Sequence, residues 1–120
     1  MFSEPDKKTT INWNTISSDE DLDALLERSK QRPQLIYKHS TICSFSRMAK
    51  SELISAAEEI EKKADINYVG VIETRPLSNK VSQVLGIRHE SPQIILVKNG
   101  EAIWDASHGG VKGSTILQQL

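Results

Sequence analysis

The feature that most limits the possible folds is an alternation of short apolar segments with longer stretches of helical periodicity. Short segments rich in β-branched and aliphatic residues predict strands, and apolar residues spaced three or four apart predict helices. In chain order the predicted elements are strand 11–16, helix 19–30, strand 35–39, helix 43–64, strand 66–72 and helix 77–85. Helical crossovers between successive strands place those strands parallel and adjacent in one sheet.

The C-terminal third ends this alternation with a hairpin. Asn99-Gly100 separates the apolar run 93–97 from a second short strand, 101–104, and this dipeptide favours a tight antiparallel turn. A final short helix, capped by Ser114, is expected to return to the core. The predicted order is βαβαβαββα, an α/β fold with a central mixed sheet flanked by helices, and its 120 residues fit a single domain over 1–120.

The sequence also predicts where one helix ends and which face of another helix is buried. Gly86 follows the last apolar position of helix 77–85, so it is expected to end that helix in the left-handed conformation. The apolar positions of helix 43–64 begin with Phe45 and Met48 and predict one continuous buried stripe.

The charge balance and the lengths of the apolar runs argue against two classes of partner, nucleic acids and membranes. Lys and Arg number 15 against 16 Asp and Glu, so a binder that neutralises nucleic-acid phosphates is not expected. The longest aliphatic run, 94–97, is far shorter than the roughly 18 apolar residues of a membrane span. Residues 1–8 carry charge and a proline where a secretory signal would be apolar, so we expect a cytoplasmic protein with no membrane partner.

Cys43 is the single cysteine of the chain. It excludes a disulfide within the chain and any site with several cysteine ligands, so redox chemistry here needs a second molecule. The three histidines, His39, His89 and His108, show no short ligand spacing, and no metal is expected.

The position of Cys43 makes it the candidate reactive group. It lies between the end of strand 35–39 and the start of the next helix, where open α/β sheets bind ligands. Amide groups at a helix N-terminus stabilise an anion, so they favour the thiolate and also make the sulfur a good leaving group in disulfide exchange. The competing interpretation is a buried, inert cysteine that acts as a small apolar residue.

Ser46, Pro92 and His39 are the neighbours that could complete such a site. Ser46 follows Cys43 by one helical turn, where it could donate a hydrogen bond to the sulfur or satisfy backbone groups of the first turn. Ser91-Pro92 starts a strand, a placement that suits a cis peptide bond, although most such bonds are trans. His39 could tune the thiol if its loop folds back, but a solvated loop histidine is the simpler interpretation.

Two segments carry a resemblance to a known family. Tyr37-Lys38-His39-Ser40-Thr41-Ile42-Cys43-Ser44-Phe45-Ser46 and His89-Glu90-Ser91-Pro92-Gln93 resemble the thioredoxin superfamily and, more specifically, the monothiol bacilliredoxins. The resemblance spans residues 11–110 and implies a thioredoxin-like fold. It also implies a thiol–disulfide oxidoreductase that removes bacillithiol from S-bacillithiolated proteins.

The resemblance also implies roles for individual residues. Cys43 would be the nucleophile, Ser46 would replace the resolving cysteine, and Pro92 would be a cis-proline beside the sulfur. Substrate would be bound by Ser91, Pro92, His39, Thr41 and Ser44. Bacillithiol, a low-molecular-weight thiol, would be the co-substrate, with no bound metal, nucleotide or flavin. Ser44 departs from the proline that relatives commonly have after the cysteine, which can loosen the first helical turn.

Three alternatives stay open at this point. Cys43-Ser44-Phe45-Ser46 also resembles the Cys-Gly-Phe-Ser element of monothiol glutaredoxins, which carry iron–sulfur clusters; against this, Ser44 fills space that glycine leaves open, and no Cys-Asp follows Gly109-Gly110. A thioredoxin-like adaptor with a vestigial thiol is the second alternative. The third is a cysteine peroxidase, for which the Thr-x-x-Cys spacing is missing.

Overall fold

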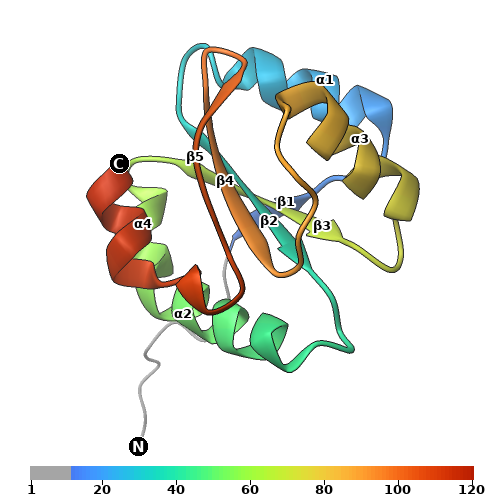
Figure 1. The fold of residues 1–120 in the computed structure, drawn as a ribbon. Helices are drawn as coiled ribbons and strands as arrows, with labels where there is room; N and C mark the ends of the chain where they lie inside the picture. Colours follow the sequence, from blue (N-terminus) through green and yellow to red (C-terminus); the bar gives the residue numbers. More distant parts are fainter. Residues whose placement is uncertain (1–11) are drawn as a thin grey trace, which may run out of the picture.

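A computed structural model describes residues 12–120, which form a five-stranded sheet with helices on both faces (Figure 1). The elements are β1 (Trp13–Thr15), α1 (Asp19–Arg28), β2 (Gln34–His39), α2 (Ser44–Glu61), β3 (Asp65–Gly70), α3 (Arg75–Leu85), β4 (Gln93–Lys98), β5 (Glu101–Ser107), the 3₁₀ turn η1 (His108–Gly110) and α4 (Gly113–Gln119). The predicted order βαβαβαββα is confirmed. Ile11 of the first predicted strand and the charged stretch 1–8 lie outside the described residues.

The strands are ordered β1-β3-β2-β4-β5, with β2 in the centre. β3 pairs parallel with β1 and β2, as the helical crossovers predict. β4 pairs antiparallel with both β2 and β5, so the sheet is mixed. The antiparallel pairing of β4 with β2 was not predicted, because a helix between two strands of a sequence is most often read as a parallel crossover.

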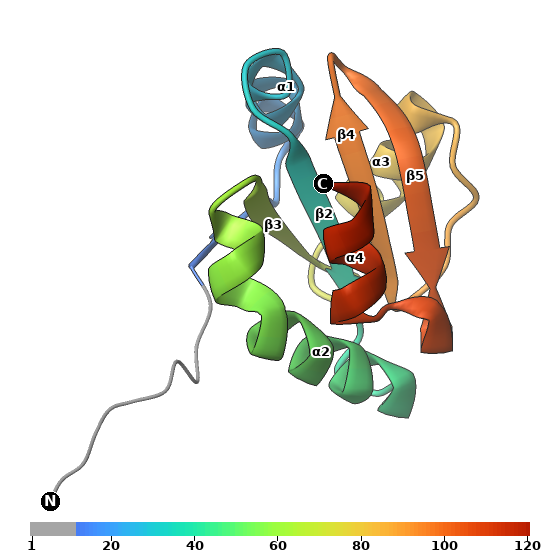
Figure 2. The ribbon, with the colours of Figure 1, turned by 90° about the vertical axis from the view of Figure 1, so that its left-hand side faces the viewer.

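The two faces of the sheet are covered by different helix pairs, α2 with α4 and α1 with α3 (Figures 1 and 2). Successive strand side chains point to opposite faces. Leu35 and Tyr37 therefore join the core under α2 and α4, whereas Ile36 joins the core under α1 and α3. Every residue of β2 is buried, so the carboxyl end of this strand, which leads to Cys43, is held on both faces.

Turn and cap residues fix the ends of several elements. Gly86 ends α3 at φ 68°, and Asn99 and Gly100 make the β4–β5 turn at φ 52° and 78°, as predicted. The predicted cap at Ser114 is wrong, because α4 already begins at Gly113. The first amide of this helix is satisfied from α2 instead, since the Gly113 N–H donates to Glu52 Oε1 at 2.8 Å.

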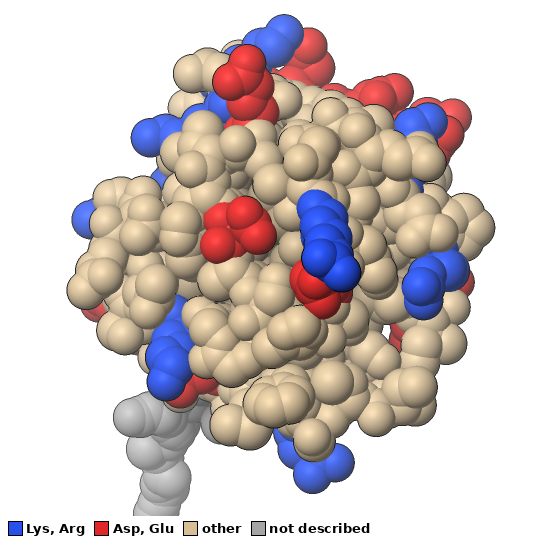
Figure 3. Space-filling view, in the orientation of Figure 1, with Lys and Arg blue, Asp and Glu red and all other residues tan. Residues whose placement is uncertain are grey.

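The surface is consistent with the near-neutral charge balance. On the face shown in Figure 3, basic and acidic side chains are interspersed in small groups, with uncharged surface between them. From residue 12 to residue 120, no helix is both long and apolar enough to span a membrane.

Candidate active site

Cys43 lies at the start of α2, four residues after the end of β2. It is the N-cap residue, with extended backbone angles of φ −108° and ψ 124°, and its side chain makes no capping hydrogen bond. The Cys43 N–H donates to the Ser40 carbonyl at 3.2 Å, which closes the loop before the helix. The thiol is partly exposed, so it is accessible, and it lies at the N-terminal end of the helix.

Ser46 takes neither of the two roles that its spacing allowed. Its hydroxyl oxygen accepts a hydrogen bond from the Ser40 N–H at 3.1 Å, and the side chain is fully buried. Ser40 precedes the helix, so this bond connects the first turn of α2 to the loop rather than to Cys43 or to the first-turn amides. Ser46 therefore fixes the shape of the loop that carries the cysteine.

Ser91 and Pro92 lie beside Cys43, although they are distant from it in the sequence. The Ser91–Pro92 peptide bond is cis, and the Cys43 Sγ lies 4.0 Å from the Ser91 carbonyl oxygen. The Pro92 carbonyl accepts a hydrogen bond from the His108 N–H at 2.9 Å, so the residue after β5 helps to hold this segment. Residues 48 positions apart in sequence thus meet at the sulfur.

His39 is buried, which contradicts its interpretation as a solvated loop histidine. It is 7% exposed, and its Nδ1 lies 2.7 Å from the Tyr37 hydroxyl. That hydroxyl also donates to the Ser46 carbonyl at 2.9 Å. Because the phenol has one proton, His39 carries its own proton on Nδ1 and donates it to the Tyr37 oxygen. The pair therefore links the end of β2 to the first turn of α2.

Burial also sets the protonation of this pair. Burial is the main cause that lowers the pKa of His39; the Lys50 charge adds to it and Glu73 opposes it. Burial likewise raises the pKa of Tyr37 well above its ordinary value of 10. Both groups are neutral near pH 7, so beneath the cysteine they act as hydrogen-bonding groups rather than as charges.

The surface around Cys43 is more apolar than the sequence suggested. Thr41 and Ser44 flank the cysteine and are exposed, as a substrate contact requires. Phe45 and Met48, predicted to continue the buried stripe of α2, are 47% and 61% exposed, and Ile42 is 85% exposed. The buried positions in this part of α2 are Ser46 and Ala49, so Phe45 and Met48 lie beside the buried face of the helix rather than on it.

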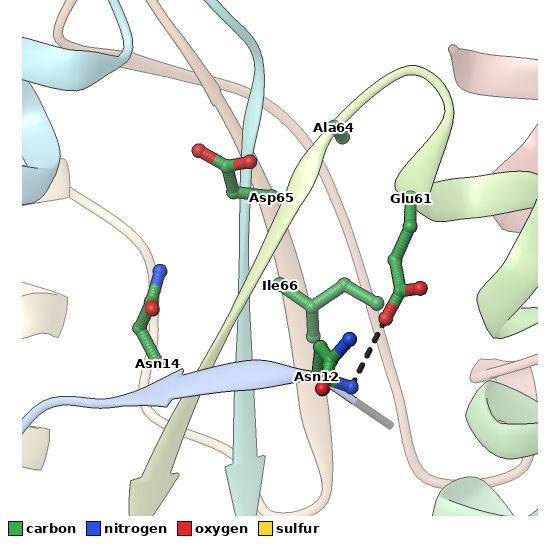
Figure 4. A pocket seen from close by; sticks show the side chains of 6 residues that line it. All are labelled: Asn12, Asn14, Glu61, Ala64, Asp65 and Ile66. Atoms are coloured by element: carbon green, nitrogen blue, oxygen red, sulfur yellow. Dashed lines mark hydrogen bonds between the residues drawn. The ribbon is translucent and has the colours of Figure 1, made fainter. Parts of the chain in front are cut away.

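A pocket of about 250 Å³ lies at the opposite end of the sheet. It is lined by Asn12, Asn14, Glu61, Ala64, Asp65 and Ile66, and the Asn12 N–H donates to Glu61 Oε2 at 3.1 Å (Figure 4). Its wall includes the amino end of β3, whereas Cys43 follows the carboxyl end of the parallel strand β2. It holds no nucleophile. Within residues 12–120, no cluster of three or more His, Cys, Asp or Glu side chains could hold a metal ion.

Comparisons with known proteins agree with this geometry. A family model described as monothiol bacilliredoxin BrxC matches residues 14–116. One similar solved structure is a thioredoxin-fold protein whose description proposes an oxidoreductase; it is 28% identical, with a TM-score of 0.78 over 88% of this chain and 90% of that one. Thioredoxins from Fasciola hepatica and Malassezia sympodialis share the fold. The Fasciola hepatica protein is 18% identical, with a TM-score of 0.70 over 88% of this chain and 94% of that one. The Malassezia sympodialis protein is 20% identical, with a TM-score of 0.71 over 92% of this chain and 91% of that one. The predicted thioredoxin-like fold is confirmed.

Proposed function

The chain belongs to the monothiol bacilliredoxin family, and on this premise we propose that it removes bacillithiol from protein mixed disulfides. One observation supports the proposal most strongly. Cys43, the single cysteine, lies at the start of a helix and is partly exposed, and its Sγ is 4.0 Å from the carbonyl of Ser91, which precedes the cis-proline. We place the reaction in the cytoplasm, where cysteines stay reduced and mixed disulfides are repaired.

The first step transfers the small thiol from the modified protein to Cys43. The Cys43 thiolate, stabilised by the first-turn amides of α2, attacks the bacillithiol sulfur of the mixed disulfide. A new disulfide forms between Cys43 and bacillithiol while the original disulfide breaks. The protein sulfur leaves with the bonding electrons and takes a proton from solvent, so the substrate protein is released as a free thiol.

The second step needs a second molecule of bacillithiol. Its thiolate attacks the bacillithiol sulfur bound to Cys43, forms the symmetrical bacillithiol disulfide and releases the Cys43 thiolate. The helix terminus assists this departure because it stabilises the developing anion. Ser46 occupies the position of a resolving cysteine and has no sulfur, so the enzyme cannot complete this step within its own chain.

The remaining residues support these two steps in the proposal. Ser46 and His39 hold the loop and the first turn of α2 through their hydrogen bonds, so they position the sulfur. Exposed Thr41 and Ser44 contact the bound thiol, and Ser91 offers it backbone groups beside Pro92.

Intact-mass spectrometry tests the proposal. Wild type and Cys43→Ala are mixed separately with a bacillithiolated and a glutathionylated protein. We expect the bacillithiol adduct to move to wild type alone, and faster than the glutathione adduct. A substrate that keeps its adduct in the presence of wild type would favour the non-catalytic adaptor, and visible absorption after anaerobic reconstitution with iron and sulfide would favour the cluster carrier.

A further inference from the structure

A buried lysine in the centre of the sheet is not used by the proposed reaction. Lys38 is the fifth residue of β2, and its side chain has no exposed surface. Its Nζ donates to the Ser78 carbonyl at 2.9 Å, to Ser82 Oγ at 2.8 Å and to His89 Nδ1 at 3.1 Å. A buried ammonium is costly unless all of its donors are satisfied, and here three acceptors match its three N–H groups.

Two of these acceptors belong to α3, whereas His89 belongs to residues 86–92, which join α3 to β4 and are called here the proline segment. Because His89 Nδ1 accepts from Lys38, its ring is neutral and carries its proton on Nε2. Gln93 lies opposite Lys38 in the β2–β4 register, and its Nε2 donates to the Arg88 carbonyl at 2.9 Å. Two neighbouring side chains of the sheet therefore hold residues 88 and 89 from inside.

The proline segment ends at the candidate active site. His89 precedes Ser91 by two residues, and the Ser91 carbonyl is the group that lies 4.0 Å from Cys43 Sγ. On the outer side, Glu90 Oε1 lies 3.2 Å from His108 Nε2 across a partly exposed contact. The contacts of Lys38 and Gln93 hold the segment at residues 88 and 89 from the interior, and the His108 N–H holds its end through the Pro92 carbonyl at 2.9 Å.

We propose that Lys38, acting through His89, is a positioning residue that holds the proline segment so that the Ser91 backbone faces Cys43. Neither Lys38 nor His89 contacts the sulfur, so their effect on the reaction passes through Ser91. The catalytic consequence rests on the proposed function; the positioning of the segment itself does not.

Protonation gives this arrangement a distinctive response. A proton on His89 Nδ1 would remove the acceptor and place two cations in contact. The groups that face His89 are Lys38 on β2, Arg75 and Ser78 on α3, and Glu90 in its own segment. Burial first, then the charges of Lys38 and Arg75, lower the pKa of His89, and Glu90 opposes them. The contact therefore persists below the ordinary histidine value of 6.5 and is lost in more acidic solution.

Three variants and one control test the proposal. His89→Leu removes the acceptor and keeps Lys38, whereas Lys38→Met removes the donor. His89→Asn keeps an acceptor in the same place, because Asn Oδ1 is bonded to Cγ as His Nδ1 is, and it has no charge at any pH. Lys80→Met removes an exposed lysine from α3 and is the matched control. For each protein we measure kcat and KM for bacillithiol transfer, the rate of Cys43 alkylation by iodoacetamide, and hydrogen exchange in 86–91 relative to α1.

The expected result is a selective loss. His89→Leu should lower kcat/KM about 10- to 100-fold, as small misplacements near reacting atoms do, and leave alkylation at the wild-type rate. His89→Asn should transfer bacillithiol as wild type does. Its transfer rate should not fall in acidic solution, whereas the wild-type rate should. Wild-type transfer by His89→Leu would overturn the proposal, and so would equal losses of transfer and alkylation.

Hydrogen exchange separates this proposal from the proposed function. If wild type transfers no bacillithiol, the proposed function fails, and exchange alone decides the positioning. The positioning is supported if hydrogen exchange in residues 86–91 is faster in His89→Leu and Lys38→Met while exchange in α1 is unchanged. Lys80→Met should show the exchange rates of wild type. Unchanged exchange in both variants overturns it.

Discussion

Raising the pH from 8 to about 9.5 should stabilise the fold, because Lys38 is buried as an ammonium. Burial, and then the charge of Arg75, lowers the pKa of Lys38 from 10.5 to about 8. In the unfolded chain the lysine regains its ordinary pKa. Between the two values the unfolded state binds more protons than the folded state, so the free energy of unfolding rises with pH across this window.

The size of the effect follows from the two pKa values. At about 1.4 kcal/mol per unit, a lysine that titrates at about 8 when folded and 10.5 when unfolded adds about 1.5 kcal/mol between pH 8 and about 9.5. Lys38 has no exposed surface, so solvent screening does not reduce this figure. The raised pKa of Tyr37 acts in the opposite direction, but mainly above its ordinary value of 10.

Urea unfolding of wild type and Lys38→Met at both pH values measures the effect, and comparing the two proteins cancels the other titrating groups. Wild type should gain about 1.5 kcal/mol more than Lys38→Met over this range. Lys80→Met, which lacks an exposed lysine of α3, should behave as wild type. Parallel pH dependence of wild type and Lys38→Met would refute the reasoning, since the charge of Lys38 would then not be coupled to folding.

Three further predictions concern the neighbours of the site and one helix end. Ser46→Ala removes the acceptor of the buried Ser40 N–H and should lower the free energy of unfolding in urea by about 1 to 2 kcal/mol. Ser55→Ala, at an exposed position of the same helix, should lower it by less than about 0.5 kcal/mol. Equal losses would contradict the role of the Ser46 hydroxyl. Gly86→Ala forces a left-handed alanine and should cost about 1 kcal/mol, whereas Gly109→Ala, with open space and no positive φ, should be nearly neutral; a neutral Gly86→Ala would show that the backbone there relaxes. The Tyr37 phenol should ionise only above its ordinary pKa of 10, measured as the difference in alkaline absorbance between wild type and Tyr37→Phe, and a midpoint at 10 would exclude burial of this hydroxyl in solution.

Local sequence signals predicted most of the fold because each acts within a few residues. Gly86 ends a helix and Asn99-Gly100 makes a turn by their own backbone preferences, so no distant partner is needed. The pairing of β4 with β2 depends instead on how the sheet is covered on both faces. The start of α4 depends on Glu52, which lies 61 positions away from Gly113.

The candidate site was predictable in its positions but not in its contacts. Cys43 follows the end of a strand and begins a helix, and both signals are local. The burial of Lys38 was not predictable from its residue type, because its polar partners lie on α3 and in the proline segment. The His39 ring bonds to Tyr37 of its own strand, but it also lies beside Tyr68 of β3, with ring centroids 5.7 Å apart, a contact that the residue type does not signal. Phe45 and Met48 were expected in the buried stripe of α2, but that stripe passes through Ser46 and Ala49, and an apolar pattern does not identify a face that includes a buried serine.

A single-turnover experiment tests the central claim most directly. Reduced protein in slight excess is mixed with a bacillithiolated substrate in the absence of free bacillithiol, and fragment masses locate the adduct. We expect one bacillithiol on Cys43 for each substrate thiol released. Release of the substrate thiol with no adduct on Cys43, or a substrate that stays modified, would contradict the assignment of this sulfur as the nucleophile.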